Sequence, residues 1–204
     1  MKNAPVFSGF KSRKMIAAEY GIDLQTLREK LMLNGIDLPG PPPLTDWGSA
    51  RQFLSTFQFH SNENFSNPFE AAAALEDVWN ILLNPPWRLS RTGKKAKLFL
   101  QDVEKHFKEH HILEFYTGRL HLTVQKLRAI CGKELGRCPS SCIQLRLVLE
   151  ALLQLEEGDL QIQQIGFELG FDDSNYFYRF FKKNTSWNAS KLQAWVDAGG
   201  RYAI

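Results

Sequence analysis

The chain has 204 residues, of which 44% are hydrophobic and 12% aromatic, and this composition excludes a largely disordered protein. A formal net charge of +3 permits binding to a polyanion but does not by itself indicate it. No run of 18 apolar residues occurs, so we expect no membrane-spanning helix.

The N-terminal residues predict a small helical region followed by a linker. The opening MKNAPVFSGFKSRK has no long apolar core, so we expect no secretory signal and a cytoplasmic location. Within residues 1–38, Ser12 and Asp23 can each cap a short amphipathic helix with Gly21 between them. This pattern predicts a helix-turn-helix-like region. The alternative is a helical hairpin that packs on the rest of the chain, which would have the same sequence pattern. Residues 39–48 hold four prolines and two glycines and predict a stiff linker.

Residues 49–84 predict a helical region that either packs on the rest of the chain or dimerises. An alanine-rich stretch follows Pro68, which is typical of a helix N-terminus. Its apolar stripe consists of Leu75, Val78, Trp79, Leu82 and Leu83. Soluble monomers rarely expose such a patch, so we expect it to be buried in the core or in a homodimer.

Residues 85–97 predict a basic linker. They contain five cations and no acid: Arg88, Arg91, Lys94, Lys95 and Lys97. Such a segment is usually a solvated loop, but beside a DNA-binding unit it could contact phosphates.

Residues 98–196 predict a helical domain, with a first helix-turn-helix unit near its start and a tail, 197–204, after it. Thr123 can cap the second helix of this unit. That helix would turn Leu127, Ile130 and Cys131 inward and Gln125, Lys126, Arg128 and Ala129 outward. Pro139 then begins a long helix that spans about 25 Å.

The stretch IQQIGFELGFDDSNYFYRFFKK, residues 162–183, predicts a second helix-turn-helix. Gly170 suits the turn, and Asp172 or Asp173 can cap the helix that follows. We assign Tyr176, Phe177, Phe180 and Phe181 to its buried face, and Ser174, Asn175, Tyr178, Arg179 and Lys182 to its outward face. The outward side chains can read base edges or clamp phosphates, although an ordinary helical hairpin has a similar pattern. Adjacent major-groove faces lie about 34 Å apart, so the long helix is a plausible spacer.

The fixed spacings in residues 113–193 match those of a known family. In the second unit they are carried by Ile162, Ile165, Gly170, Phe171, Asp173, Tyr176, Phe177, Arg179, Phe181, Lys182 and Lys183. In the long helix they are carried by Ile143, Arg146, Leu147, Ala151, Leu152 and Leu153, and in the first unit by Tyr116, Leu120, Leu127 and Gly136. These residues resemble the DNA-binding domain of the AraC/XylS transcription regulators. The chain departs from that family at Ala129, Cys131, Gly166, Ser186 and Ala189.

The resemblance implies an all-α fold with two helix-turn-helix units joined by a long helix. Residues 1–95 show no run of alternating strands, so we expect the small helical region in place of the family's usual β-barrel sensor. The groove-facing residues it implies are Gln125, Arg128 and Ala129 in the first unit, and Ser174, Asn175, Tyr178 and Arg179 in the second. We add the outward cations Lys126 and Lys182 to these candidate DNA-binding residues.

The first functional hypothesis is a bacterial transcription regulator that inserts two recognition helices into successive major-groove faces. Its expected partners are double-stranded DNA, RNA polymerase and a second copy of the chain. The alternative is a diverged helical module that acts through protein–protein interaction. Residues 114–195 favour this alternative, because ten Lys and Arg against nine Asp and Glu give a net charge of only +1.

Catalysis and metal binding are not expected. The chain has no HExxH, GxxxxGK[ST] or GxSxG motif. Cys131, Cys138 and Cys142 lack the spacing of a zinc module, and a lone pair such as His106 and His110, four apart on a predicted helix, usually belongs to a solvated face. We therefore predict no enzyme, no cofactor and no metal site.

Overall fold

A computed structural model describes Gly21 and residues 46–57, 68–86 and 88–197, with the side chain of Trp195 left aside. Within these ranges every regular element is a helix, so the predicted all-α fold class is confirmed. The predicted helix-turn-helix-like region in residues 1–38, most of the linker 39–48 and the tail after Asp197 lie outside the described residues.

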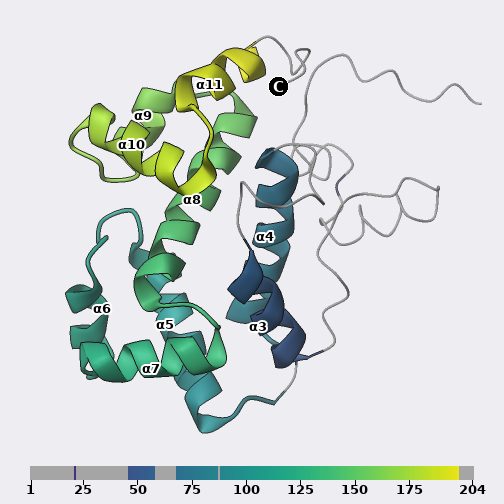
Figure 1. Cartoon of the computed structure of the whole chain (residues 1–204), viewed down its shortest axis with the longest axis vertical. Coiled ribbons are helices and arrows are strands. Elements are labelled where there is room, and N and C mark those ends of the chain that lie inside the picture. Colours follow the sequence, from purple (N-terminus) through teal and green to yellow (C-terminus); the bar gives the residue numbers. More distant parts are fainter. Residues whose placement is uncertain (1–20, 22–45, 58–67, 87, 198–204) are drawn as a thin grey trace, which may run out of the picture.

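The described helices follow one another along the chain and are labelled in Figure 1. They are α3 (Trp47–Thr56), α4 (Pro68–Leu83), α5 (Arg91–His106), α6 (Leu113–Arg119), α7 (Val124–Glu134), α8 (Pro139–Glu157), α9 (Ile162–Glu168), α10 (Ser174–Thr185) and α11 (Ala189–Asp197). None of these helices is both long enough and apolar enough to cross a membrane.

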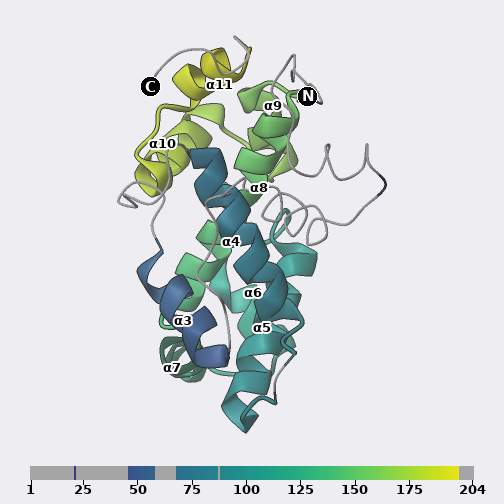
Figure 2. The ribbon, with the colours of Figure 1, turned by 90° about the vertical axis from the view of Figure 1, so that its right-hand side faces the viewer.

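Helix α8 is the axis around which the other helices pack. Pro139 lies at its first turn and Gly158 ends it in the left-handed conformation with φ 77°, as glycine does at helix C-termini. Its 19 residues span about 28 Å. Helices α5 and α7 pack against it, as do α9, α10 and α11, and α4 lies along its other side (Figures 1 and 2).

The apolar stripe of α4 is buried within the chain. Leu75, Val78 and Leu82 have no exposed surface, and Trp79 is 2% exposed. Helix α4 contacts α3, α5 and α8, so its stripe belongs to the same core cluster as the apolar residues of α8. The stripe is therefore covered without a second copy of the chain.

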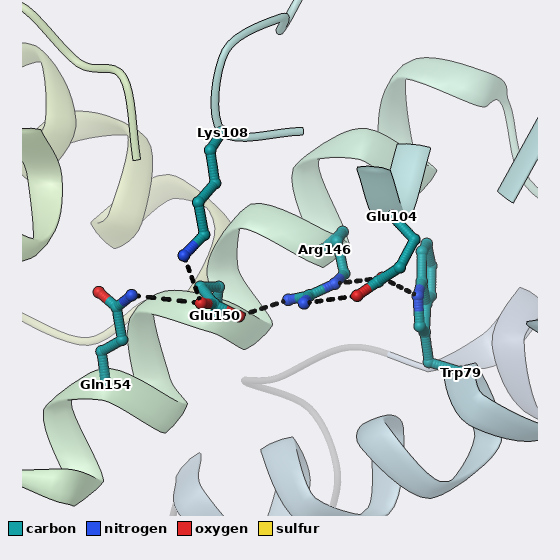
Figure 3. Close-up of polar contacts among 6 residues, drawn as sticks. All are labelled: Trp79, Glu104, Lys108, Arg146, Glu150 and Gln154. Atoms are coloured by element: carbon teal, nitrogen blue, oxygen red, sulfur yellow. Dashed lines mark hydrogen bonds and ion pairs between the residues drawn. The ribbon is translucent and has the colours of Figure 1, made fainter. Parts of the chain in front are cut away.

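A buried polar network joins α4, α5 and α8 (Figure 3). The Trp79 indole donates to the Glu104 carboxylate at 2.8 Å. Arg146 donates to both oxygens of Glu104 at 2.6 and 2.9 Å, and to Glu150 at 2.9 Å. Burial opposes the charge of Arg146, but the hydrogen bonds and charges of Glu104 and Glu150 outweigh it and raise the Arg146 pKa. Arg146 of α8 bonds to Glu104 of α5, and Glu104 also accepts from Trp79 of α4. These contacts fix the position of the three helices relative to one another.

Two predicted linkers end earlier than expected because polar residues cap the helices that follow. Ser90 accepts a hydrogen bond from the Gly93 amide, so α5 begins at Arg91 and the prediction of a basic linker through residue 97 is wrong. Ala96 and Phe99, which have no exposed surface, anchor that helix. Likewise Asp46 forms a capping box with Ser49, so Trp47 and Gly48 belong to α3 rather than to the linker 39–48.

Candidate nucleic-acid interface

The structure contains two helix-turn-helix units with the same turn. Helices α6 and α7 form the first unit, and α9 and α10 form the second. Three backbone hydrogen bonds close each turn and are shifted by 49 residues (120 to 169, 121 to 170, 122 to 171). The donors are Leu120, His121 and Leu122 in one turn and Leu169, Gly170 and Phe171 in the other. His121 and Gly170 take the left-handed conformation at matching positions, with φ 51° and 79°.

Helix α7 presents a polar and cationic face to solvent. Thr123 caps it by accepting a hydrogen bond from the Lys126 amide at 3.2 Å, as the sequence predicts. Its inward side chains are Leu127, Ile130 and Cys131, none more than 6% exposed. Its exposed residues are Gln125, Lys126, Arg128, Ala129, Gly132 and Lys133. The predicted candidates Gln125, Lys126 and Arg128 therefore share one accessible face, to which the structure adds Lys133.

Helix α10 has its buried face rotated from the predicted one. Its fully buried side chains are Phe177, Phe181 and Thr185. Tyr176 is 55% exposed, so its assignment to the buried face is wrong. Tyr178 is only partly exposed and packs against the core, so it is not a free outward side chain.

The exposed face of α10 consists of Asn175, Tyr176, Arg179, Lys182 and Lys183. Of the other predicted candidates in this helix, Ser174 and Tyr178 lie at the edge of that face and are partly buried. Tyr176 and Lys183 are missing from the predicted candidates, although both had been matched to family positions.

Arg179 is free to meet a ligand. Within the described part of the chain it forms no ion pair with Asp172 or Asp173. Asp173 instead caps α10 by accepting a hydrogen bond from the Asn175 amide at 2.8 Å. Figures 1 and 2 show α7 and α10 toward the same side of α8, each near one end of the molecule.

Comparisons with known proteins agree with this geometry. Residues 116–194 match a family model described as a helix-turn-helix domain. Over 109 residues the chain is 25% identical to the HTH-type transcriptional activator RhaS of Salmonella schwarzengrund (strain CVM19633), and equally to that of Salmonella newport (strain SL254). This region is an AraC-type helix-turn-helix domain.

The match to these activators covers 52% of this chain and 39% of each relative. This match therefore spans about half of the present chain and about two fifths of the length of the relatives. No solved structure matches the chain.

Two departures of this AraC-type domain from the family pattern have structural consequences. Gly166 lies against Phe177, and a Cβ added there would be 2.8 Å from the Phe177 ring. Helices α9 and α10 can therefore pack more closely here than an alanine would allow. Ser186 stands where the family usually has glycine, and it ends α10 with φ 63°, a conformation that costs an L-residue about 1–2 kcal/mol.

The loop before α6 contacts the turn of the second unit. The His111 ring lies 2.8 Å from the Leu169 carbonyl oxygen through Nε2, and its centroid is 4.9 Å from that of Phe171. A Cβ at Gly170 would lie only 2.2 Å from the Lys108 carbonyl oxygen, so this contact requires glycine. Burial lowers the pKa of His111 below its usual 6.5, which favours the neutral ring.

The three cysteines of the AraC-type domain differ in environment. Cys131 and Cys142 are buried, and burial raises the pKa of Cys142 to about 12, so both are thiols that fill the core. Cys138 is exposed at the N-cap of α8. In the described ranges, no group of three or more His, Cys, Asp or Glu residues is placed to hold a metal ion.

Proposed function

We propose that the chain is an AraC-type transcription regulator that binds double-stranded DNA sequence-specifically through α7 and α10. One observation supports this above the others. Helices α7 and α10, which follow the two matched turns, present cationic faces without acids on the same side of α8. The roughly 28 Å length of α8 is comparable with the 34 Å repeat of B-DNA, so the two helices can enter successive major-groove faces.

The low net charge of residues 114–195 does not oppose this function, because none of the acids lies on the exposed faces of α7 and α10. Glu134 is 7% exposed and faces the start of α5, and Glu150 is bonded to Arg146 and Lys108. The exposed faces of α7 and α10 hold six cations and no carboxylate: Lys126, Arg128, Lys133, Arg179, Lys182 and Lys183. A surface of this kind binds phosphates with Lys and Arg and reads bases with Arg, Asn and Gln.

Arg179 is the residue whose loss tests the proposal most directly. It lies one turn after Asn175 on the same face, so both can enter one groove. The buried rings of Phe177 and Phe181 hold the helix beneath it. If Arg179 donates two hydrogen bonds to a guanine, Arg179→Ala lowers affinity by about 1–3 kcal/mol and relaxes preference at one base pair.

The experiment begins with selection of bound duplexes from a random library, followed by fluorescence-anisotropy titration of the selected site. Arg179→Lys keeps the charge but loses the planar fork, so it separates base reading from phosphate contact. Arg51→Ala is the control, because Arg51 is exposed on α3, outside both units. Selection of no preferred sequence by the native chain would refute sequence-specific binding. An Arg179→Ala variant that is destabilised but binds normally when folded would remove α10 as the reading helix.

Contact with RNA polymerase and formation of a homodimer also belong to this proposal. The relatives are named as transcriptional activators, which suggests that an AraC-type chain can act on polymerase once bound. Sedimentation of the chain with and without the selected duplex distinguishes one bound copy from two.

A further inference from the structure

The start of α5 carries cations where a helix disfavours them. Arg91 is the first residue of α5, and Lys94 and Lys95 follow within its first two turns, with no acid in the first turn. The N-terminus of a helix carries a partial positive charge, so cations here destabilise the helix. Arg88 precedes the helix and Lys97 follows on it. None of these five cations forms an ion pair with any described residue.

This cationic segment is fixed beside the first recognition helix. Glu134, the last residue of α7, accepts hydrogen bonds from Thr92 and from Ser90, the latter at 3.4 Å. A Cβ added at Gly93 would lie 3.3 Å from the same carboxylate. The negative charge of Glu134 therefore meets the N-terminus of α5, while Arg91 and Lys94 are exposed to solvent and Lys95 and Lys97 are partly exposed. Figures 1 and 2 show the start of α5 next to α7, at the end of the molecule away from α10.

The segment holds a large share of the positive charge of the chain. Residues 88–97 carry five cations, and the exposed faces of α7 and α10 carry three each, eleven in all. Because the whole chain has a formal net charge of +3, the remaining residues carry a net charge of −8. These three surfaces are therefore positively charged on a chain whose other residues are together net negative.

We propose that Arg88, Arg91, Lys94, Lys95 and Lys97 form a phosphate-binding surface that contacts the DNA backbone flanking the groove occupied by α7. This inference rests on the proposed function and adds a third point of contact to the two recognition helices. The contact is independent of sequence, since phosphates position a protein on the duplex without specifying bases. Each phosphate neutralised by a cation adds about 0.9 to the slope of log K against log salt.

The test compares the native chain with Lys94→Gln and with Arg91→Gln/Lys94→Gln, since both residues are exposed. Affinity for the selected duplex is measured by anisotropy from low to physiological salt. The expected slope falls by about one in the single variant and about two in the double variant, with base preference unchanged. The Tm of the variants should rise while the salt slope falls, because each substitution removes a positive charge from the positive end of the helix dipole.

Lys105→Gln is the matched control. Lys105 is exposed in the last turn of the same helix, where the dipole favours a cation. Its substitution should leave the salt slope unchanged and lower Tm slightly. A duplex shortened on the α7 side should also abolish the difference between native and Lys94→Gln chains.

Two outcomes overturn the inference and can be told apart from failure of the proposed function. If the native chain binds its selected site and the α5 variants keep its salt slope, the α5 surface alone is refuted. If Lys105→Gln reduces the slope as much as Lys94→Gln does, the effect is one of overall charge and the surface is again refuted. A native chain that binds no duplex contradicts the proposed function itself.

Discussion

The two helix-turn-helix units close their turns with the same hydrogen bonds but differ in what lies against the turn. In the first unit, exposed His121 occupies the left-handed position. In the second, Gly170 occupies it, with the Lys108 carbonyl and the His111 ring packed against the turn. A turn in solvent accepts a strained side chain, whereas a turn covered by backbone does not. The second unit is therefore held by residues that precede the first unit, and α8 is not the only connection between α7 and α10.

Among the substitutions that test this difference between the two turns, Gly170→Ala should lower the free energy of unfolding most. The substitution combines left-handed strain with a Cβ placed 2.2 Å from the Lys108 carbonyl oxygen, so we expect a loss of about 3 kcal/mol or more. Gly158→Ala is the control, because Gly158 has φ 77° and nothing within 4 Å of an added Cβ. It should cost about 1 kcal/mol. Equal losses in urea denaturation would show that the loop does not constrain the turn.

Gly166→Ala tests the first helices of the two units. Phe177 must move to admit the new methyl group, so unfolding free energy should fall by about 1–3 kcal/mol. At the equivalent position of the first unit, Thr117 is buried and accommodated. Gly118→Ala in α6 is the control, since an added Cβ there meets nothing within 4 Å and alanine favours the helix by about 1 kcal/mol. If Gly166→Ala leaves the free energy of unfolding unchanged, α9 and α10 pack no more closely than alanine permits.

Acidification should weaken the contact that holds the second turn. The pKa of His111 is lowered by burial, so the unfolded chain takes up the proton first as the pH falls below about 6.5. Stability due to this group is thus present above pH 6.5 and is lost below it, with a limiting slope of about 1.4 kcal/mol per pH unit. Comparing native and His111→Gln chains by urea denaturation between pH 5 and 8 isolates this residue from the other histidines. Parallel pH profiles would show that His111 is not responsible.

Replacing His121 or Ser186, the two non-glycine residues with positive φ in the described part of the chain, by glycine should have the smallest effect and should raise the free energy of unfolding. His121→Gly relieves strain of about 1–2 kcal/mol but adds about 0.4–1 kcal/mol of unfolded-state entropy, so a net gain of about 0.5–1 kcal/mol is expected. Ser186→Gly should gain a similar amount at the end of α10. Ser190→Gly, at an exposed helical site in α11, should instead destabilise. A loss of stability in His121→Gly would mean that the first turn depends on contacts of that side chain.

Much of this architecture follows from local sequence signals. Thr123, Pro139 and Asp173 each begin a helix where the sequence predicts one, because capping depends on few neighbours. The start of α5 could not be recognised in the same way. Its cations look like a solvated loop until Ala96 and Phe99 are seen to pack on the core.

The side of α10 that is buried could not be predicted from the sequence. Aromatic residues at 176, 177, 178, 180 and 181 extend around most of the helix, so composition cannot select the buried side. The choice is made by tertiary contacts: Phe177 packs against Gly166, and Thr185 is buried with its hydroxyl donating to the Phe181 carbonyl. This packing exposes Tyr176 and partly buries Tyr178, which changes the candidate surface by one tyrosine. The α5–α6 loop against Gly170 is a contact about 60 residues apart, and no local pattern predicts it.

The cover that α4 provides for α8 shows that the folding unit is larger than the region matched by the family model. The region matched by the family model begins at residue 116, within α6, and leaves α4 and α5 outside. Yet Trp79 and Leu82 share one core with the apolar residues of α8, and Glu104 joins them to Arg146. A fragment that begins at residue 116 would expose that side of α8 and leave the buried Arg146 guanidinium without Glu104. The segment covered by the family model is therefore smaller than the segment that folds, so transplanting it into another protein requires α4 and α5 as well.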